Sequence, residues 1–170
     1  PPDGASLMLQ MDGWRMLPGL EVSTAGDLVL ASEWDLYANL DDVSVANDWR
    51  FGEGNDIPGL LTLRAAGNII LNESLSDGFV DDQFILGSTV GFGETSYERL
   101  GLLESWGLRL IAGADLGSAD VHAVRDAGES DLSLAADRVI RTGSGDIEIA
   151  AAGDIGLASD AAIYTSGLFG

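Results

Sequence analysis

The sequence has no cysteine, so neither a disulfide framework nor a thiolate metal site stabilises it, and stability must come from burial and backbone pairing. Basic residues are scarce as well: 8 Lys and Arg stand against 28 Asp and Glu, for a formal net charge of −20. Such a chain repels phosphate backbones and anionic headgroups, which argues against nucleic acid and membrane surfaces as partners. No apolar run approaches the roughly 18 residues of a membrane span.

The composition is that of a folded protein. Hydrophobic residues make up 46% of the 170 positions and charged residues 21%, which excludes intrinsic disorder. Glycine is frequent, with 23 residues against 4 prolines, so the chain turns often. We expect residues 1–170 to form a single unit. The first residues, Pro1-Pro2-Asp3-Gly4, have neither an initiator Met nor a signal-peptide pattern, so we expect a mature or excised piece of a longer protein.

A short phrase recurs along the chain: a small residue, Gly, an Asp or Asn, and then alternating aliphatic residues. Its copies lie at 25–30, 66–71, 113–116 in weaker form, 145–149 and 153–157. Within each good copy the large aliphatic residues lie two apart, which predicts a strand with one buried face. The Gly-Asp and Gly-Asn steps suit corners, because Gly tolerates positive φ and Asp or Asn can bond their own backbone.

In the C-terminal part the aliphatic residues recur about every eight positions, which leaves no room for crossover helices. Stacked coils of about three strands, each coil roughly two dozen residues long, bury such strands in continuous columns. The sequence therefore predicts an all-β fold, a right-handed parallel β-helix. We expect these side chains to point inward: Leu61, Leu63, Ile69, Leu71, Leu132, Leu134, Ile147, Ile149, Ile155 and Leu157.

Two segments break the repeat and are richer in aromatic and charged residues. Residues 38–58 and 79–105 are interpreted as loop excursions that leave the coil. Within the second excursion, residues 94–106 are compatible with one short helix, although Gly101 weakens that expectation.

Three segments contain the fullest copies of this phrase or connect such copies. They are the run from Pro58 to Phe79 with Ala66-Gly67-Asn68-Ile69-Ile70-Leu71, the run from Ile140 to Ile155 with two Gly-Asp-Ile steps, and the phrase from Arg109 to Asp120. These segments resemble the repeat regions of filamentous haemagglutinin-type large exoproteins. With a fainter echo at 20–31, the resemblance covers about half the chain.

Members of that family are long β-helical rods, secreted through a dedicated outer-membrane partner (two-partner secretion), and they serve adhesion or toxin presentation. The resemblance thus implies a secreted or cell-surface location and contacts with host glycan or protein. The family's amino-terminal secretion domain has no counterpart in these residues. The resemblance therefore implies a segment of rod without the export signal.

Polysaccharide-cleaving enzymes also use β-helices, so carboxylate pairs are relevant. The pairs are Asp41/Asp42, Asp81/Asp82 and Glu73/Asp77. A glycosidase needs two carboxyls on opposed sides of a sugar, which adjacency in sequence does not provide, so we interpret these acids as solvated surface. Ser118, Asp120 and His122 suggest a Ser-His-Asp arrangement, but no nucleophile-elbow motif accompanies them, and a surface or turn histidine is favoured.

Calcium is the one cofactor considered, because Asp-rich solenoid turns can supply several oxygen ligands. Neither an EF-hand loop nor a calcium-roll nonapeptide is present. If a calcium site exists, Asp77, Asp81 and Asp82 are its candidate ligands. Otherwise we expect no cofactor.

The tryptophans are candidate partner-binding residues, because an exposed indole stacks on sugars or docks a protein. They are Trp14, Trp34, Trp49 and Trp106. The alternative is that they cap or plug the coil where the repeat is irregular.

Two functional hypotheses follow. The first is a non-catalytic rod or display segment of an adhesin-like exoprotein, and the second is a carbohydrate-active β-helix whose excursions form a cleft. An accessory subunit of a larger extracytoplasmic assembly is a further alternative. Because a cut solenoid exposes the edge of its final coil, we expect neighbouring coils or chains to cover at least one end.

Overall fold

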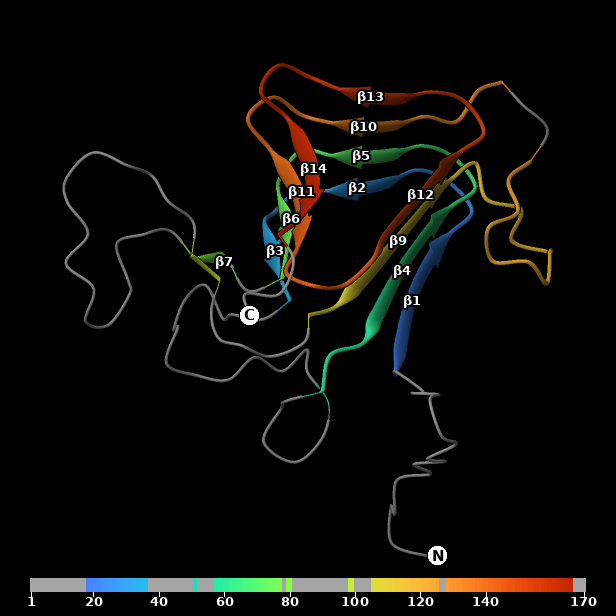
Figure 1. The fold of residues 1–170 in the computed structure, drawn as a ribbon. Coiled ribbons are helices and arrows are strands. Elements are labelled where there is room, and N and C mark those ends of the chain that lie inside the picture. Colours follow the sequence, from blue (N-terminus) through green and yellow to red (C-terminus); the bar gives the residue numbers. More distant parts are fainter. Residues whose placement is uncertain are drawn as a thin grey trace, which may run out of the picture.

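The computed structural model describes residues 18–36, 51, 57–77, 79–80, 98–99, 105–125 and 128–166. Every regular element in these ranges is a β-strand. Most strands wind into successive coils with one strand on each of three faces (Figure 1). The all-β parallel β-helix predicted from the repeat is confirmed.

Each face is one four-stranded parallel sheet. The first sheet contains β1 (Gly19–Thr24), β4 (Leu60–Ala65), β9 (Gly107–Ala112) and β12 (Ile147–Ala151). The second contains β2 (Leu28–Leu30), β5 (Ile69–Leu71), β10 (Leu132–Leu134) and β13 (Ile155–Leu157). The third contains β3 (Trp34–Asp35), β6 (Leu75–Ser76), β11 (Val139–Thr142) and β14 (Ala162–Thr165). Coils 1 to 4 each take one strand from every sheet, in this order.

The coils stack in strict register. Leu28 pairs with Ile69, Ile69 with Leu132, and Leu132 with Ile155, so the same face of every strand points into the coil. Between coils 3 and 4 the repeat is 23 residues, as the contact between Asp131 and Asp154 shows. Three strands per coil and a coil of about two dozen residues are therefore confirmed.

The interior is a set of aliphatic columns. Leu61 and Leu108 lie one above the other in the first sheet, and Leu63 and Leu110 form the next column; all four side chains are buried. Of the ten inward residues predicted from the sequence, those of coils 2 and 3 are buried as expected: Leu61, Leu63, Ile69, Leu71, Leu132 and Leu134. Ile147 and Ile149 are half-buried against the same core.

The last two predicted core residues, Ile155 and Leu157, have the expected strand register but are not buried. Ile155 continues the column of Leu132, and Leu157 that of Leu134, yet the two are 47% and 50% exposed. No strand pairs with β13 on its far side within the described ranges, so nothing there covers the end of the column. Ile155 and Leu157 thus share the inward register that the sequence predicts but remain exposed, because burial in a solenoid comes from the next coil.

The corner between the first and second sheets carries a polar ladder, formed by Asp27, Asn68, Asp131 and Asp154. Oδ1 of Asp27 accepts hydrogen bonds from the Asn68 backbone N–H at 2.7 Å and from its Nδ2 at 3.1 Å. Oδ1 of Asn68 accepts from the Asp131 N–H at 2.8 Å, and Oδ1 of Asp131 from the Asp154 N–H at 2.8 Å. The side chains of Asp27, Asn68 and Asp131 therefore each bond the backbone of the next coil, and not their own backbone as the sequence suggested.

Glycine at this corner also has a different reason from the predicted one. Gly67 and Gly153 do not adopt positive φ; a Cβ on Gly67 would meet Asp27 Oδ1, and one on Gly153 would meet Asp131 Oδ1. Gly67 and Gly153 therefore leave the space that the carboxylates of Asp27 and Asp131 occupy. The positive φ values of non-glycine residues lie at the next corner, at Asp137 (60°) and Asp160 (59°).

Two segments connect strands where the sequence predicts the excursions 38–58 and 79–105, and most of their residues lie outside the described ranges. One connects Leu36 to Leu60 and contains an antiparallel bridge between Phe51 and Ile57. Another connects Asp77 to β9 and contains the antiparallel pair β7 (Phe79–Val80) and β8 (Glu98–Arg99). Because Glu98 and Arg99 are in a strand, a helix over 94–106 is wrong at those positions.

A third excursion, which the sequence did not predict, lies at residues 113–131 between β9 and β10. Figure 1 shows it standing out where the first sheet meets the second. The phrase at 113–116, read as a weak repeat copy, is the start of this excursion and forms no coil strand. In coil 3 the ladder position is taken by Asp131 instead.

Candidate functional site

The third excursion begins as a tightly bonded loop. Ala114 and Val124 form an antiparallel bridge, and the Asp115 N–H donates to the Ala123 carbonyl at 2.8 Å. Side chains close the small turns inside it: Asp115 Oδ1 accepts from the Gly117 N–H at 3.0 Å, and Asp120 Oδ1 from the His122 N–H at 2.9 Å. Such Asx turns fix a loop without regular secondary structure.

Two arginines fasten the loop to coil 2. Arg64, on the outer face of β4, donates from Nη2 to the Asp115 carbonyl at 2.8 Å, and its Nη1 lies 3.4 Å from Glu21 Oε1. Arg125 donates from Nη2 to the Ala66 carbonyl. Arg64 therefore holds the loop through the loop's main chain, whereas Arg125 holds it through its own side chain.

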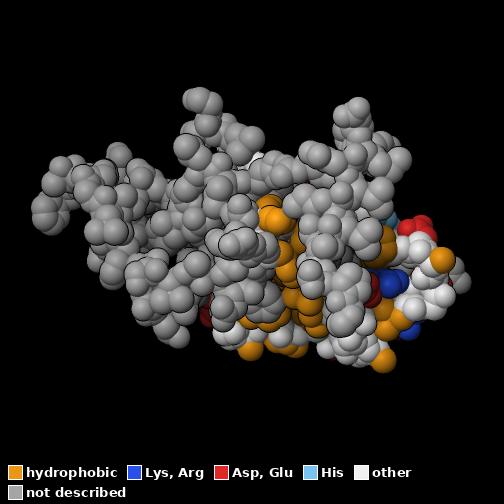
Figure 2. Space-filling view, turned by 90° about the horizontal axis from the view of Figure 1, so that it is seen from below, with side chains coloured by type: hydrophobic (Ala, Val, Ile, Leu, Met, Phe, Trp, Pro, Cys, Tyr) orange, Lys and Arg blue, Asp and Glu red, His pale blue; other side chains and the backbone are white. Residues whose placement is uncertain are grey.

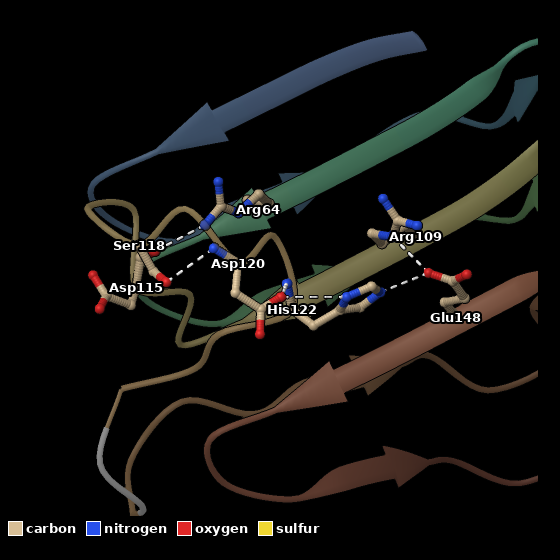
Figure 3. Close-up of polar contacts among 7 residues, drawn as sticks. All are labelled: Arg64, Arg109, Asp115, Ser118, Asp120, His122 and Glu148. Atoms are coloured by element: carbon tan, nitrogen blue, oxygen red, sulfur yellow. Dashed lines mark hydrogen bonds and ion pairs between the residues drawn. The ribbon is translucent and has the colours of Figure 1, made fainter. Parts of the chain in front are cut away.

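A third attachment joins the loop to coils 3 and 4. Oε2 of Glu148, on the outer face of β12, accepts from Arg109 Nε at 2.5 Å and contacts His122 Nε2 at 2.8 Å (Figure 3). Arg109 and Glu148 are register partners on neighbouring strands, whereas His122 comes from the loop. The ring of His122 therefore lies between two carboxylates, because Asp120 Oδ1 is 3.6 Å from Nδ1.

These contacts determine the protonation of Glu148. The hydrogen bond from Arg109 and then that from His122 lower the pKa of the Glu148 carboxyl below its ordinary value. An ionised carboxylate with both donors on one oxygen is suited to anchoring the loop. It is poorly suited to donating a proton as a general acid at neutral pH, because a general acid needs a raised pKa.

The Ser-His-Asp arrangement considered from the sequence is not assembled. Ser118 Oγ accepts from the Asp120 backbone N–H at 3.1 Å, while the two ring nitrogens of His122 face Asp120 and Glu148. A nucleophilic serine must share a hydrogen bond with its histidine base. Here Ser118 closes a turn, and the side chain of His122 is 48% exposed.

The surface of the loop combines polar and apolar groups. Leu116 is 38% and Val124 37% exposed, and both belong to the small set of large hydrophobic side chains that the described residues leave in solvent. The exposed loop positions also include Asp115, Asp120 and His122. We name residues 115–125 the display loop. Its sequence signal was the cluster of Asp, Ser and Gly that interrupts the aliphatic alternation after Ala112.

The structure places one of the three candidate calcium ligands. Asp77 follows β6, is 1% exposed, and its Oδ2 accepts a hydrogen bond from the Trp106 backbone N–H at 2.6 Å. Its pair partner Glu73 makes an ion pair with Arg138 at 2.9 Å. Asp41, Asp42, Asp81 and Asp82 lie outside the described residues. Within those residues, no group of three or more His, Asp or Glu is arranged to hold a metal ion.

Two of the four candidate tryptophans are described. Trp106 is fully buried, with its ring 5.7 Å from that of Phe51 between centroids, so its indole faces the interior. Trp34 is half-buried in β3 and packs against the core. Trp14 and Trp49 lie outside the described residues. Both described rings thus cover the coil interior, as the plugging alternative expects.

Comparison with known proteins returns no relative: no family model matches the chain, and no curated protein or solved structure matches it significantly. In the part of the chain that the structure describes, no helix is long and apolar enough to cross a membrane.

Proposed function

We propose that this chain is a non-catalytic rod and display segment of a secreted bacterial adhesin-like exoprotein, and that the display loop contacts protein or glycan partners. The observation that carries the proposal is the loop itself. Arg64, Arg125 and the Glu148–His122 contact fasten it to three coils, while Leu116 and Val124 remain exposed at its surface. A fixed loop on a rigid scaffold is a common arrangement for recognition.

Three further features support a rod in an extracellular setting. The coils are uniform in register, the net charge of −20 keeps a glycine-rich solenoid soluble, and several segments resemble filamentous haemagglutinin-type repeats. Adhesion, secretion and a cell-surface location follow from that resemblance and belong to the proposal.

Binding by the display loop is tested with the double variant Leu116→Ser/Val124→Ser, applied to arrays of glycans and extracellular-matrix proteins. We expect wild-type binding to fall at least tenfold in the variant. Val29→Ser is the matched control, because Val29 is 51% exposed on β2, in coil 1, and is not one of the residues that contact the loop. Binding that Val29→Ser reduces as strongly as the double variant does would contradict a role for the loop.

The carbohydrate-active alternative is tested by incubating the protein with neutral and acidic polysaccharides, with and without calcium. We expect no turnover. Turnover that Glu148→Gln abolishes would replace the display proposal with an enzymatic one centred on the Glu148–His122 contact. Antibodies against the folded chain, applied to intact producing cells, test location; labelling only after lysis contradicts a surface role.

A further inference from the structure

One asparagine of the chain begins the tripeptide Asn72-Glu73-Ser74, which forms the turn between β5 and β6. Asn-x-Ser or Asn-x-Thr, with any residue except Pro in the middle, is the pattern in which a glycan is attached to the asparagine amide. The other asparagines, at positions 39, 47, 55 and 68, have neither Ser nor Thr two residues later. Because so short a pattern also arises by chance, its structural setting decides whether it can act as an acceptor.

Asn72 is an exposed residue in an internal part of the fold. It follows Leu71, the last residue of β5, and lies in coil 2, with described coils on both sides. Its exposure therefore does not come from an end of the solenoid. Acceptor asparagines lie in surface loops, because the enzyme that attaches the glycan has to reach the amide.

The side-chain amide of Asn72 is free, although its main chain is bonded. The Asn72 N–H donates to the Leu30 carbonyl at 3.1 Å, and its carbonyl accepts from Arg138 Nε at 3.2 Å. Among the described residues, no hydrogen bond involves the Asn72 side chain. Asn68 differs, since its amide takes part in two steps of the corner ladder. The fold therefore uses the amide of Asn68 and leaves that of Asn72 available.

The other coils show that the fold does not need an asparagine at this place. The residue directly after each strand of the second sheet occupies the same position in all four coils, because the last residues of these strands are register partners. These residues are Ala31, Asn72, Ala135 and Ala158. The neighbours of Asn72 in coils 1 and 3 are thus alanines, which leave space around the amide for a bulky group.

The other two residues of the tripeptide have structural partners. Ser74 Oγ accepts a hydrogen bond from the Val139 N–H at 3.1 Å, and Glu73 Oε2 lies 2.9 Å from Arg138 Nε. These contacts fasten the turn to coil 3 and account for Ser74 and Glu73 as parts of the fold. Asn72 is the member of the tripeptide whose side chain has no structural role.

The turn also lies away from the other surface features of the molecule. Figure 1 shows it at one end of the second sheet, whereas the third excursion stands out at the opposite end. Figure 2, which is seen from below, shows hydrophobic side chains gathered on that face, and the β5–β6 turn lies in the upper part of Figure 1. A glycan on this turn therefore covers neither the display loop nor that hydrophobic face.

We propose that Asn72 is an N-glycosylation site, which a glycosyltransferase of the producing cell modifies with a sugar activated by a phosphate or pyrophosphate group. Nδ2 of Asn72 forms a bond to the anomeric carbon of the sugar, and the bond from that carbon to the phosphate oxygen breaks. The phosphate group leaves with the electron pair, and the amide proton passes to a base of the transferase. This inference goes beyond the proposed display function and does not depend on it.

Peptide mapping of the chain purified from its producing cells tests the site. Trypsin cleaves after Arg64 and Arg99 and releases residues 65–99, in which Asn68 and Asn72 are the two asparagines. We expect the mass of one or more hexose or N-acetylhexosamine units on this peptide, placed at Asn72 by electron-transfer fragmentation, with Asn68 unmodified. The chain has no lysine, so sugar added without an enzyme to a lysine amine is excluded as its source.

Variants made in the producing cells test whether the tripeptide directs the modification. Asn72→Gln keeps an amide but should lose the glycan completely, and Ser74→Ala should lose it as well. Ser74→Thr should retain the glycan, because Thr also completes the pattern. Since Ser74→Ala also removes the acceptor for the Val139 N–H, Ser74→Thr and Asn72→Gln keep the test valid if Ser74→Ala does not fold.

The stability of unglycosylated chains tests the structural argument. Made in a cell-free system, Asn72→Ala should melt at the wild-type temperature, because three coils already have alanine at this position. Asn68→Ala is the matched control and should melt lower, since it removes two steps of the ladder.

Four results would overturn the proposal. The first is a peptide 65–99 that carries no sugar in the producing cells, and the second is a sugar attached to another residue of that peptide. The third is a glycan that folded Ser74→Ala or Asn72→Gln retains. The fourth is a loss of melting temperature in Asn72→Ala as large as that in Asn68→Ala, which would show that the fold uses both amides.

Discussion

The backbone N–H of Asp154 donates a hydrogen bond of 2.8 Å to Oδ1 of Asp131, which lies one coil below at the same corner. The same relation links Asn68 to Asp27 and Asp131 to Asn68. Since the side chain of one coil satisfies the main chain of the next, the ladder fixes the stagger of the coils where two sheets meet. Its residues are exposed, so it contributes specificity of register more than burial.

The first prediction concerns the ladder. Asp131→Ala removes the acceptor for the Asp154 N–H and should lower the free energy of unfolding by about 1 kcal/mol. Asp131→Asn keeps an amide oxygen at that place and should cost less. Urea unfolding measures both. Equal losses in the two variants would show that the charge of Asp131, and not its hydrogen bond, matters.

The second prediction concerns space at the corner. A Cβ on Gly67 would lie 2.9 Å from the Gly26 carbonyl carbon and 3.0 Å from the Asp27 nitrogen, both of which are backbone atoms. We expect Gly67→Ala to destabilise the fold by about 1–3 kcal/mol, as overpacking does. Gly26→Ala is the matched control, because a Cβ on Gly26 would meet nothing within 4 Å, and it should stay within about 0.5 kcal/mol of the wild type. Thermal melting of the two variants tests the pair.

The third prediction compares two residues of one column. Leu132 is fully buried between Ile69 and Ile155, so Leu132→Ala should cost about 2–5 kcal/mol. Ile155→Ala acts at the open end, where the side chain is 47% exposed, and should cost about half as much or less. Chemical denaturation of the two variants measures the difference, and equal losses would contradict the coil order.

The fourth prediction concerns pH. The lowered pKa of Glu148 means that its contacts with Arg109 and His122 stabilise the folded chain at pH values above the ordinary carboxyl pKa. That contribution is lost as pH falls through the folded-state pKa. Glu148→Gln should therefore melt below the wild type at pH 7, and the two should converge in acid.

Arg109→Gln provides the matched control, because it removes the largest cause of the shift and leaves the carboxyl in place. The melting temperature of Arg109→Gln, like that of Glu148→Gln, should lie below the wild-type value at pH 7 and approach it in acid. A difference between the wild type and Glu148→Gln that persists unchanged into acid would show that packing, and not ionisation, explains the effect.

The architecture follows from the local pattern of the sequence. Strands as short as Leu28–Leu30, Ile69–Leu71 and Ile155–Leu157 each have one aliphatic face because their large side chains alternate. The short spacing of such strands in the C-terminal part excludes helical crossovers, which leaves stacked coils as the way to bury them. Both properties are local, so they can be read without knowledge of which residues meet.

The same phrase of the sequence forms different structures at different places, and the difference comes from tertiary contacts. Gly67-Asn68 forms a ladder step because Asp27 lies beneath it, whereas Gly113 to Leu116 begins a loop although its letters are similar. His122 and Glu148 are 26 residues apart and meet because that loop folds back over the first sheet. The alternation of side chains in β13 directs Ile155 inward, but no described strand covers it on the far side, so it is exposed. These outcomes depend on contacts with residues of the neighbouring coil. A local sequence pattern does not specify which residues those are.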